Sequence, residues 1–297
     1  MKPILVTGVG GSVGGLGQKI VRDLLDARVP VRVLVYRNKD VAREFEREGT
    51  EIVMGNLTDL HDVHRAIDGC ERMYFGMSVS DKYLEATVNV AAVAKHHGLK
   101  ALVNMSQMTV SQMSITETTP SPQQKLHWLS EQVLNWSGLP VVHVRPTIFM
   151  EAFSFMARPM KGDGNMRVPF GQARSSPIAA SDVAFAVSKI LLNPAPHIGK
   201  AYQLTGPQSQ TMEQIAEEYS RGLGKRVSYI DTPFEEWLKE FASEGFSSHA
   251  REHVATMAAL HKQNRYDRYT EDFKQLTGKD PITIEKWVSA MTKEGAR

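Results

Sequence analysis

Near the start of the chain, six glycines lie within ten positions, directly after a short apolar segment. They are Gly8, Gly10, Gly11, Gly14, Gly15 and Gly17. Residues 4–6 before them are typical of a buried parallel strand, and Ile20, Val21, Leu24 and Leu25 follow at helical spacing. In such a strand–loop–helix unit, glycines let the backbone approach phosphate oxygens, and the helix N-terminus offers free N–H groups and a positive dipole end. The stretch predicts a pyrophosphate cradle, with an ordinary glycine-rich turn as the alternative.

The glycine spacing fits a G-x-x-G-x-x-G pattern in two registers. One register uses Gly8, Gly11 and Gly14, and the other uses Gly11, Gly14 and Gly17. The apolar positions of the helix favour Gly17 as the glycine packed under the helix start, with Gly8 ending the strand and about three extra residues in the loop. Together with Thr7, these glycines are the expected cofactor-binding residues of the loop.

The residue that follows the second apolar segment, residues 31–36, indicates whether the cofactor is NAD or NADP. An Asp or Glu at this place would accept the ribose hydroxyls of NAD. Here the place holds Arg37, with Lys39 just beyond. A guanidinium can bind a 2′-phosphate with two hydrogen bonds, so the sequence favours NADP, with NAD possible. A solvated charge at a strand end is the alternative.

Apolar segments and helical patterns alternate along the first half of the chain. Strands are expected at 31–36, 51–54, 73–77, 101–105 and 141–145, with helices at 41–48, 60–67, 82–97 and 123–136. Short connections between alternating elements predict an α/β, Rossmann-type, doubly wound parallel sheet.

Ligands of such sheets bind beyond the carboxyl ends of the strands. Asn56, Met77, Ser106 and Pro146 fall at such ends and are expected to bind the cofactor. The Asn56 amide suits the adenine edge, although Asn is also a common turn former.

The second half of the chain is less regular. We expect residues 1–150 to bind the cofactor and residues 151–297 to form a smaller, mostly helical C-terminal lobe for the substrate. Parts of 176–206 are expected to complete the sheet. Residues 151–170 look like a loop or short hairpin with a glycine-rich turn at 161–164, whereas Thr211 and Gln214 predict a capping box.

The composition of the chain argues against several classes of protein. The chain has 297 residues, is 42% hydrophobic and carries a net charge of +2, which argues against a nucleic-acid surface. Its single cysteine, Cys70, excludes an intramolecular disulfide and suits a reducing compartment. Adjacent His96 and His97 point in different directions on a helix, so no metal site is expected. Without an apolar run that could span a membrane, we expect a cytoplasmic protein, monomeric or homodimeric.

Seven motifs together resemble the NmrA-like branch of the atypical short-chain dehydrogenases/reductases. They are VTG with the glycine loop at the start, GNLTD at 55–59, LVNMS at 102–106, VRPTIFMEAF at 144–153, SPIAASDVA at 176–184, YQLTGP at 202–207 and TGKDP at 277–281. The resemblance spans nearly the whole chain. It implies a Rossmann domain, a smaller C-terminal lobe and a substrate between them.

The resemblance also exposes a departure in the catalytic helix. The broader superfamily uses Tyr-x-x-x-Lys, in which the Lys holds the nicotinamide ribose and the Tyr donates a proton. These positions fall on Gln123 and His127, whereas Ser106 matches the superfamily's catalytic Ser. An imidazole can bind the ribose and exchange a proton near neutral pH, so Ser106 and His127 are the expected catalytic residues. The alternative is a half-buried helix histidine beside Trp128.

Two functions fit these residues. The first is an NAD(P)H-dependent oxidoreductase that transfers hydride to an apolar conjugated acceptor, such as a quinone, azo dye, enone or aromatic polyketide-like compound. Such acceptors delocalise negative charge, so a strong acid is less necessary. The second is a non-catalytic, NADP-sensing regulatory protein that binds a protein partner.

The reductase hypothesis requires an adaptable apolar pocket for a small-molecule substrate. Its expected members are Met108, Phe149, Met150, Phe153 and Met156. Each of these residues can instead be ordinary core.

Overall fold

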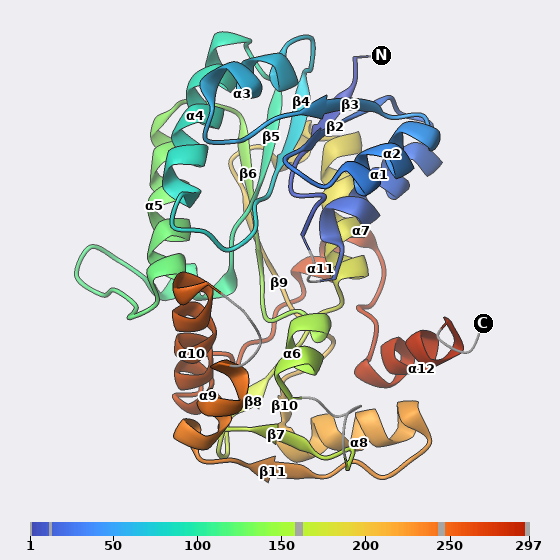
Figure 1. The fold of residues 1–297 in the computed structure, drawn as a ribbon, viewed down its shortest axis with the longest axis vertical. Coiled ribbons are helices and arrows are strands. Elements are labelled where there is room, and N and C mark those ends of the chain that lie inside the picture. The colour runs from blue at the N-terminus through green and yellow to red at the C-terminus, as the bar shows by residue number, and fades with distance from the viewer. Residues whose placement is uncertain (1, 12–13, 158–162, 243–246, 295–297) are drawn as a thin grey trace. The chain divides into compact units, whose positions relative to one another are not determined.

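The computed structural model describes residues 2–11, 14–157, 163–242 and 247–294 (Figure 1). The chain divides into two units, Met1–Arg145 with Val183–Tyr202, and Pro146–Asp182 with Gln203–Arg297. Whether these units correspond to a cofactor domain and a substrate lobe divided near residue 150 stays a prediction.

A seven-stranded sheet organises the first unit (Figure 1). Its strands are β1 (Ile4–Val6), β2 (Val31–Val35), β3 (Glu51–Met54), β4 (Arg72–Phe75), β5 (Ala101–Met105), β6 (Val141–Pro146) and β9 (Ala201–Leu204). They lie in the order β3-β2-β1-β4-β5-β6-β9, and β1 pairs in parallel with both β2 and β4. The strand order reverses between β1 and β4, which makes this the topological switch point. The predicted Rossmann-type sheet is confirmed.

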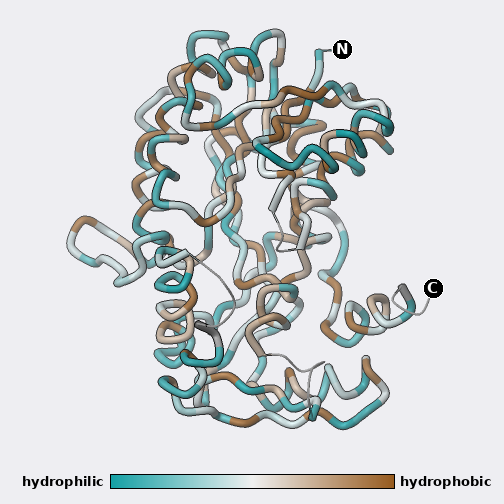
Figure 2. Tube along the Cα trace, viewed as in Figure 1, coloured by the Kyte–Doolittle hydropathy of each residue, from teal (hydrophilic) through white to brown (hydrophobic). Residues whose placement is uncertain are grey.

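Helices cover both faces of this sheet (Figure 1). One face carries α1 (Leu16–Asp26), α2 (Lys39–Arg47) and α7 (Ala180–Leu192), and the other carries α3 (Leu60–Ile67), α4 (Tyr83–His96) and α5 (Pro122–Trp136). Leu5, Met73 and Leu102 pack in one buried cluster with residues of α3, α4 and α5. Strands buried on both faces are mostly apolar, and Figure 2 shows the contrast between the hydrophobic strands and the hydrophilic α2.

Local capping interactions fix where several helices begin. The Asn38 side chain accepts the Val41 N–H at the start of α2, and Asp59 caps α3. At α8 (Met212–Leu223), Thr211 and Gln214 form the predicted capping box. These side chains satisfy N–H groups that have no partner within the helix.

The second unit is mostly helical. Besides α8 it contains α6 (Met150–Ala157), α9 (Phe234–Ala242), α10 (Ser248–Lys262), α11 (Asp272–Thr277) and α12 (Ile284–Glu294). Two small sheets join β7 (Met166–Val168) to β11 (Tyr229–Asp231) and β8 (Arg174–Ser175) to β10 (Gln210–Thr211). Their core includes Phe170, Tyr219 and Trp237.

The loop or hairpin predicted at 151–170 is wrong for residues 151–157, which lie in helix α6. This helix buries Met150, Phe153 and Met156 in the core of the second unit. Both carboxylate oxygens of Glu151 accept the backbone N–H of Ala180, which anchors the first turn. These contacts are tertiary, so the local pattern did not reveal them. The glycine-rich turn at 161–164 lies partly outside the described residues.

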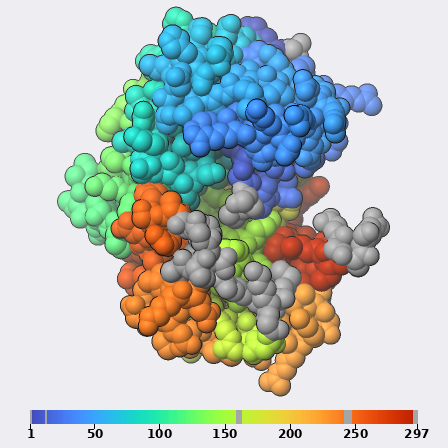
Figure 3. Space-filling view, in the orientation of Figure 1, coloured from blue at the N-terminus to red at the C-terminus, as the bar shows by residue number. Residues whose placement is uncertain are grey.

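Two further features of the described structure concern its helices and its surface. No helix among the described residues is both long enough and apolar enough to cross a membrane. The segment between β5 and α5 projects from the surface, and Ile115 there is 88% exposed (Figure 3).

A buried histidine in the second unit makes its stability depend on pH. His261 on α10 stacks between Phe170 and Tyr266, with ring centroids 4.1 and 3.9 Å away. Its Nδ1–H donates to the Met257 carbonyl at 2.9 Å. Burial lowers the pKa of His261 to about 3. The folded protein therefore holds this ring neutral, while the unfolded chain takes up a proton below about pH 6.5.

Stability from His261 is fully present above about pH 6.5 and falls as the pH drops toward the folded pKa. We expect the free energy of unfolding to fall by about 2–3 kcal/mol between about pH 7 and about pH 4.5 from this group. His261→Phe keeps an aromatic ring in the stack without a titrating group, so its stability should decline less. Urea unfolding across this range measures both proteins, and an equal decline in the two contradicts the assignment.

Candidate functional site

The end of β1 touches the loop after β4. The Thr7 hydroxyl is fully buried, donates to the Gly76 carbonyl at 2.8 Å and accepts the Gly76 N–H at 3.0 Å. Gly8 has φ +73°, and a Cβ built on it would lie 2.7 Å from the Gly76 oxygen. Residue 8 must therefore be glycine, and the Thr7 side chain holds this approach together. The strand predicted at 73–77 ends at Phe75 because Gly76 takes part in this contact.

Gly17 lies against the same point from α1. A Cβ on Gly17 would lie 3.0 Å from the carbonyl carbon and oxygen of Gly8. This confirms Gly17 as the glycine packed under the helix start. Gly14 has a left-handed φ of +67°, and the Gly11 N–H donates to the Gly8 oxygen at 3.4 Å. That these glycines contact a cofactor stays a prediction.

The N-terminus of α1 faces no acidic side chain of its own first turn. Its N-cap, Gly15, is left-handed with φ 57° and makes no side-chain hydrogen bond. Gln18 donates to the Val9 carbonyl at 3.0 Å, which ties the helix to the loop. The helix keeps the positive end of its dipole and its first N–H groups, so the cradle fits a pyrophosphate.

The end of β2 presents a cation at the surface. The Arg37 guanidinium carbon lies 4.4 Å from the ring centroid of Tyr36, which is 52% exposed. Lys39 starts α2 directly after the Asn38 cap. Two exposed cations at the end of the strand beside β1 fit a 2′-phosphate.

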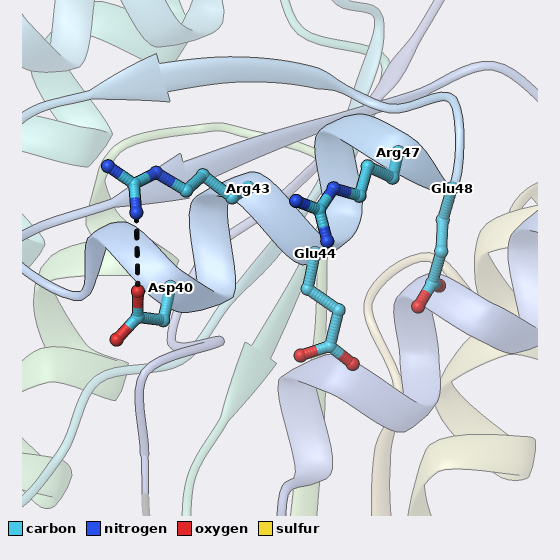
Figure 4. A pocket seen from close by; sticks show the side chains of 5 residues that line it. All are labelled: Asp40, Arg43, Glu44, Arg47 and Glu48. Carbon is cyan, nitrogen blue, oxygen red and sulfur yellow. Dashed lines mark ion pairs between the residues drawn. The ribbon is translucent and has the colours of Figure 1, made fainter.

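A depression along α2 lies close by in the sequence but has a different character (Figure 4). It is lined by Asp40, Arg43, Glu44, Arg47 and Glu48. Arg43 pairs with Asp40 at 3.7 Å, and Glu48 pairs with Arg22 of α1 at 3.3 Å. The alternating charges leave no cationic surface for phosphate, so this depression is a network of surface ion pairs.

Asn56 and Met77 are placed at the ends of β3 and β4, as predicted. The Asn56 side-chain oxygen accepts the Thr58 N–H at 3.1 Å, and its backbone N–H donates to Asp62 at 2.8 Å. Asn56 thus shapes a turn, and its contact with adenine stays a prediction. Met77 is half-buried against the cluster under α3, α4 and α5.

Ser106 follows β5 and carries a buried, unsatisfied hydroxyl. The residue is 4% exposed, and its backbone N–H donates to the Val144 carbonyl at 2.8 Å. Its Oγ has no hydrogen-bond partner among the residues that the structure describes. A buried hydroxyl without a partner costs about 1–3 kcal/mol, so Ser106 suits a ligand oxygen or nitrogen. Met108, two residues on, is buried.

His127 lies half-buried on α5 and contacts a ring of α4 and a side chain of its own helix. Its ring centroid is 4.3 Å from that of Tyr83 on α4, and its Nε2 is 3.2 Å from Nε2 of Gln123. The Tyr83 hydroxyl donates to the Met105 carbonyl at 2.9 Å, which places the Tyr83 ring at the end of β5. Burial raises the pKa of Tyr83 far above its usual value, so the phenol stays neutral. Gln123 accepts the Ser80 N–H at 3.1 Å.

Tyr83 and Ser80 contact His127 and Gln123 but were not among the predicted site residues. Ser80 lies in the connection from β4 to α4, and Tyr83 begins α4, so the rule that ligands bind beyond strand ends was a signal for this connection.

Polar contacts fix α5 to the sheet. Glu131, 1% exposed, accepts the Arg145 Nε–H at 2.9 Å and also pairs with Nη2 of the same guanidinium. His143 bridges Asn104 on β5 and Asn135 on α5, with both hydrogen bonds at 3.0 Å. Burial lowers the pKa of His143, which keeps it neutral between the two amides. The helix that carries His127 is therefore held by directional bonds.

The remaining predicted site residues belong to the second unit. Pro146 ends β6 and is buried, and Phe149 forms a parallel bridge with Ile178. Met150, Phe153 and Met156 lie in the core cluster described above, as the alternative of ordinary core packing expects. Their role as a substrate pocket stays a prediction.

The tight contact of Gly17 gives an expected outcome. Gly17→Ala gains helix propensity, yet its Cβ collides with the Gly8 backbone, so we expect a net loss of about 1–3 kcal/mol. Gly10 has nothing within 4 Å of an added Cβ and is the control, expected to change stability by less than about 0.5 kcal/mol. Chemical unfolding compares the two, and equal stability of both variants would show that the contact is not tight.

Comparison with known proteins identifies the family. The NmrA-like family matches residues 1–291. An NAD(P)H azoreductase of Xenophilus azovorans is 25% identical over 282 residues, which are 94% of this chain and 96% of that protein. A (4-alkanoyl-5-oxo-2,5-dihydrofuran-3-yl)methyl phosphate reductase of Streptomyces griseus is 30% identical over 226 residues, 76% of each chain. An NADPH-dependent quinone oxidoreductase of Escherichia coli, solved with NADPH, has a TM-score of 0.82 and 22% identity, covering 97% of this chain and 99% of that chain. The chain therefore belongs to the NmrA-like family, as its motifs predicted.

Proposed function

We propose that this protein is an NADPH-dependent reductase that transfers a hydride to an apolar conjugated acceptor. The observation that carries the proposal is the cradle at the switch point, where Gly8 and Gly17 meet under an α1 N-terminus without acidic side chains. Relatives named as an azoreductase and a quinone oxidoreductase support the reaction class.

Each part of the cofactor finds chemically suited residues. Gly8, Gly11, Gly14 and Gly17 would bind the pyrophosphate beside Thr7, and Arg37 the 2′-phosphate. Asn56 would bind the adenine end, and Met77, Ser106, His127 and Pro146 would bind the nicotinamide end. When bound, NADPH supplies the hydride from its nicotinamide ring.

The chain itself offers no strong acid at the expected position. An amide such as Gln123 does not release a proton at neutral pH. The Tyr83 phenol is neutral and donates to the Met105 carbonyl. Ser106 and His127 can donate hydrogen bonds to a developing negative charge, while the acceptor delocalises most of it. This set of residues suits quinones, azo dyes, enones and aromatic polyketide-like compounds better than isolated ketones.

The absence of Tyr-x-x-x-Lys also favours a second candidate, an NADP-sensing regulator that binds a protein partner, since sensing requires the cradle but no acid. A cytoplasmic location, a monomeric or homodimeric state and the lack of a nucleic-acid partner remain predictions for either function.

NADPH consumption with a panel of quinones, azo dyes and enones tests the reductase. We expect turnover with at least one acceptor, and His127→Ala should lower kcat/KM by about 10²-fold because it removes a hydrogen-bonding group at the reacting end. Tight NADP binding without turnover of any acceptor would reject the reductase and leave the regulator.

Arg37→Ala tests the cofactor preference. Loss of a charge-assisted hydrogen bond should weaken NADP binding by about 10- to 100-fold and leave NAD binding nearly unchanged. Arg43→Ala is the matched control, because Arg43 is also an arginine of this region but pairs with Asp40. Calorimetry with both dinucleotides gives the ratio, and an unchanged ratio in Arg37→Ala refutes the assignment.

A further inference from the structure

We propose that Gln123 is a positioning residue that holds His127 as a neutral imidazole with its proton on Nδ1. This inference concerns the state of His127 and rests on the proposed function only for its consequence in catalysis. It follows from two hydrogen bonds of one buried amide.

The Ser80 backbone determines which way the Gln123 amide points. Gln123 is 1% exposed, and its Oε1 lies 3.1 Å from the Ser80 nitrogen. A backbone N–H can only donate, so the atom facing it must be the amide oxygen. The amide NH₂ of Gln123 then faces the opposite way.

The amide NH₂ in turn determines the proton of His127. Nε2 of Gln123 lies 3.2 Å from Nε2 of His127, and an NH₂ group can only donate. His127 Nε2 must therefore accept, which leaves the ring proton on Nδ1. Protonation of His127 would place an N–H against the NH₂ of Gln123, so this contact disfavours the imidazolium.

Three described neighbours of His127 bear on its protonation. From α4, Tyr83 presents a ring at 4.3 Å, and the hydroxyl of that ring is neutral and donates to a carbonyl. One turn along α5, the carboxylate of Glu131 is engaged by Arg145. Lys125, two residues away, is exposed on another face of the helix.

This arrangement gives Gln123 a defined part in the reaction. Nδ1–H of His127 is a hydrogen-bond donor whose state does not change near neutral pH. In the proposed reductase it can support a ribose hydroxyl or a developing oxyanion, but it does not deliver a proton as an imidazolium. The final proton of the product then comes from solvent.

Nitrogen-resolved NMR of the histidine rings tests the proposal on the free protein, without substrate. The protein has ten histidines, and His127→Gln identifies the signals of His127 by their loss. We expect the wild-type ring to show the Nδ1–H tautomer and to stay neutral between about pH 8 and about pH 6. An Nε2–H tautomer, or an imidazolium signal over this range, overturns the proposal.

Gln123→Glu supplies the decisive comparison. A carboxylate of the same shape still accepts the Ser80 N–H, but it can now also accept a hydrogen bond from His127 Nε2. It should therefore raise the protonation midpoint of His127 by one pH unit or more, which is a tenfold change in proton affinity. Gln132→Glu places the same charge on another face of α5 and should shift the midpoint by no more than a few tenths. Equal shifts in the two variants contradict the proposal.

Two further measurements close the test. If Gln123→Glu does not fold, Gln123→Met serves instead, because its side chain has a similar length but makes neither polar contact. His127 should then show a mixture of tautomers. A ring unchanged from the wild type would refute the role of Gln123. If the protein proves to be a reductase, kcat/KM should be flat for the wild type and acquire a titration near neutral pH in Gln123→Glu. A protein without reductase activity would still show the NMR result, so the two proposals fail separately.

Discussion

The structure depends on one close approach of three backbones at Gly8. The strand end at Gly8 touches the loop at Gly76, and α1 touches the same residue through Gly17. Thr7 holds the first contact with two hydrogen bonds. A side chain at Gly8 or Gly17 would separate these elements and move the α1 N-terminus away from the switch point. The anion binding proposed for the cradle would therefore be a consequence of packing between β1, β4 and α1.

The part of the first unit proposed as the reacting end is fixed in a different way, by hydrogen bonds between buried polar groups. Glu131 and Arg145 join α5 to β6, and His143 joins Asn104 to Asn135. Apolar contacts alone allow small rotations of a helix, whereas these bonds have preferred directions. They also make substitutions at these positions destabilising, because removing one partner leaves a buried polar or charged group unsatisfied. The orientation of Gln123 and His127 on α5 depends on this network.

The sequence predicted those parts of the fold that have local signals. The bounds of β3, α3 and β5 agree with the prediction, because turn residues, caps and apolar runs mark them within a few positions. The register of Gly17 followed from the helix that it begins. Helix α6 was not predicted, because its burial and the anchor from Glu151 to Ala180 come from distant segments. The contact between Tyr83 and His127 joins two helices and leaves no trace in either local pattern.

The residues proposed to bind the cofactor differ from those proposed to act in the reaction. Replacing a tyrosine by Gln123 removes an acid but keeps a side chain that both donates and accepts. Buried between Ser80 and His127, this amide accepts a hydrogen bond from one and lies within hydrogen-bond distance of the other. In the proposed reductase, a site with a cradle and no acid would stabilise charge with fixed hydrogen bonds, for which Ser106 and His127 are the proposed donors. The acceptor must then delocalise negative charge until solvent protonates it. Substrate specificity would therefore depend on the electronic structure of the acceptor as much as on the shape of a pocket.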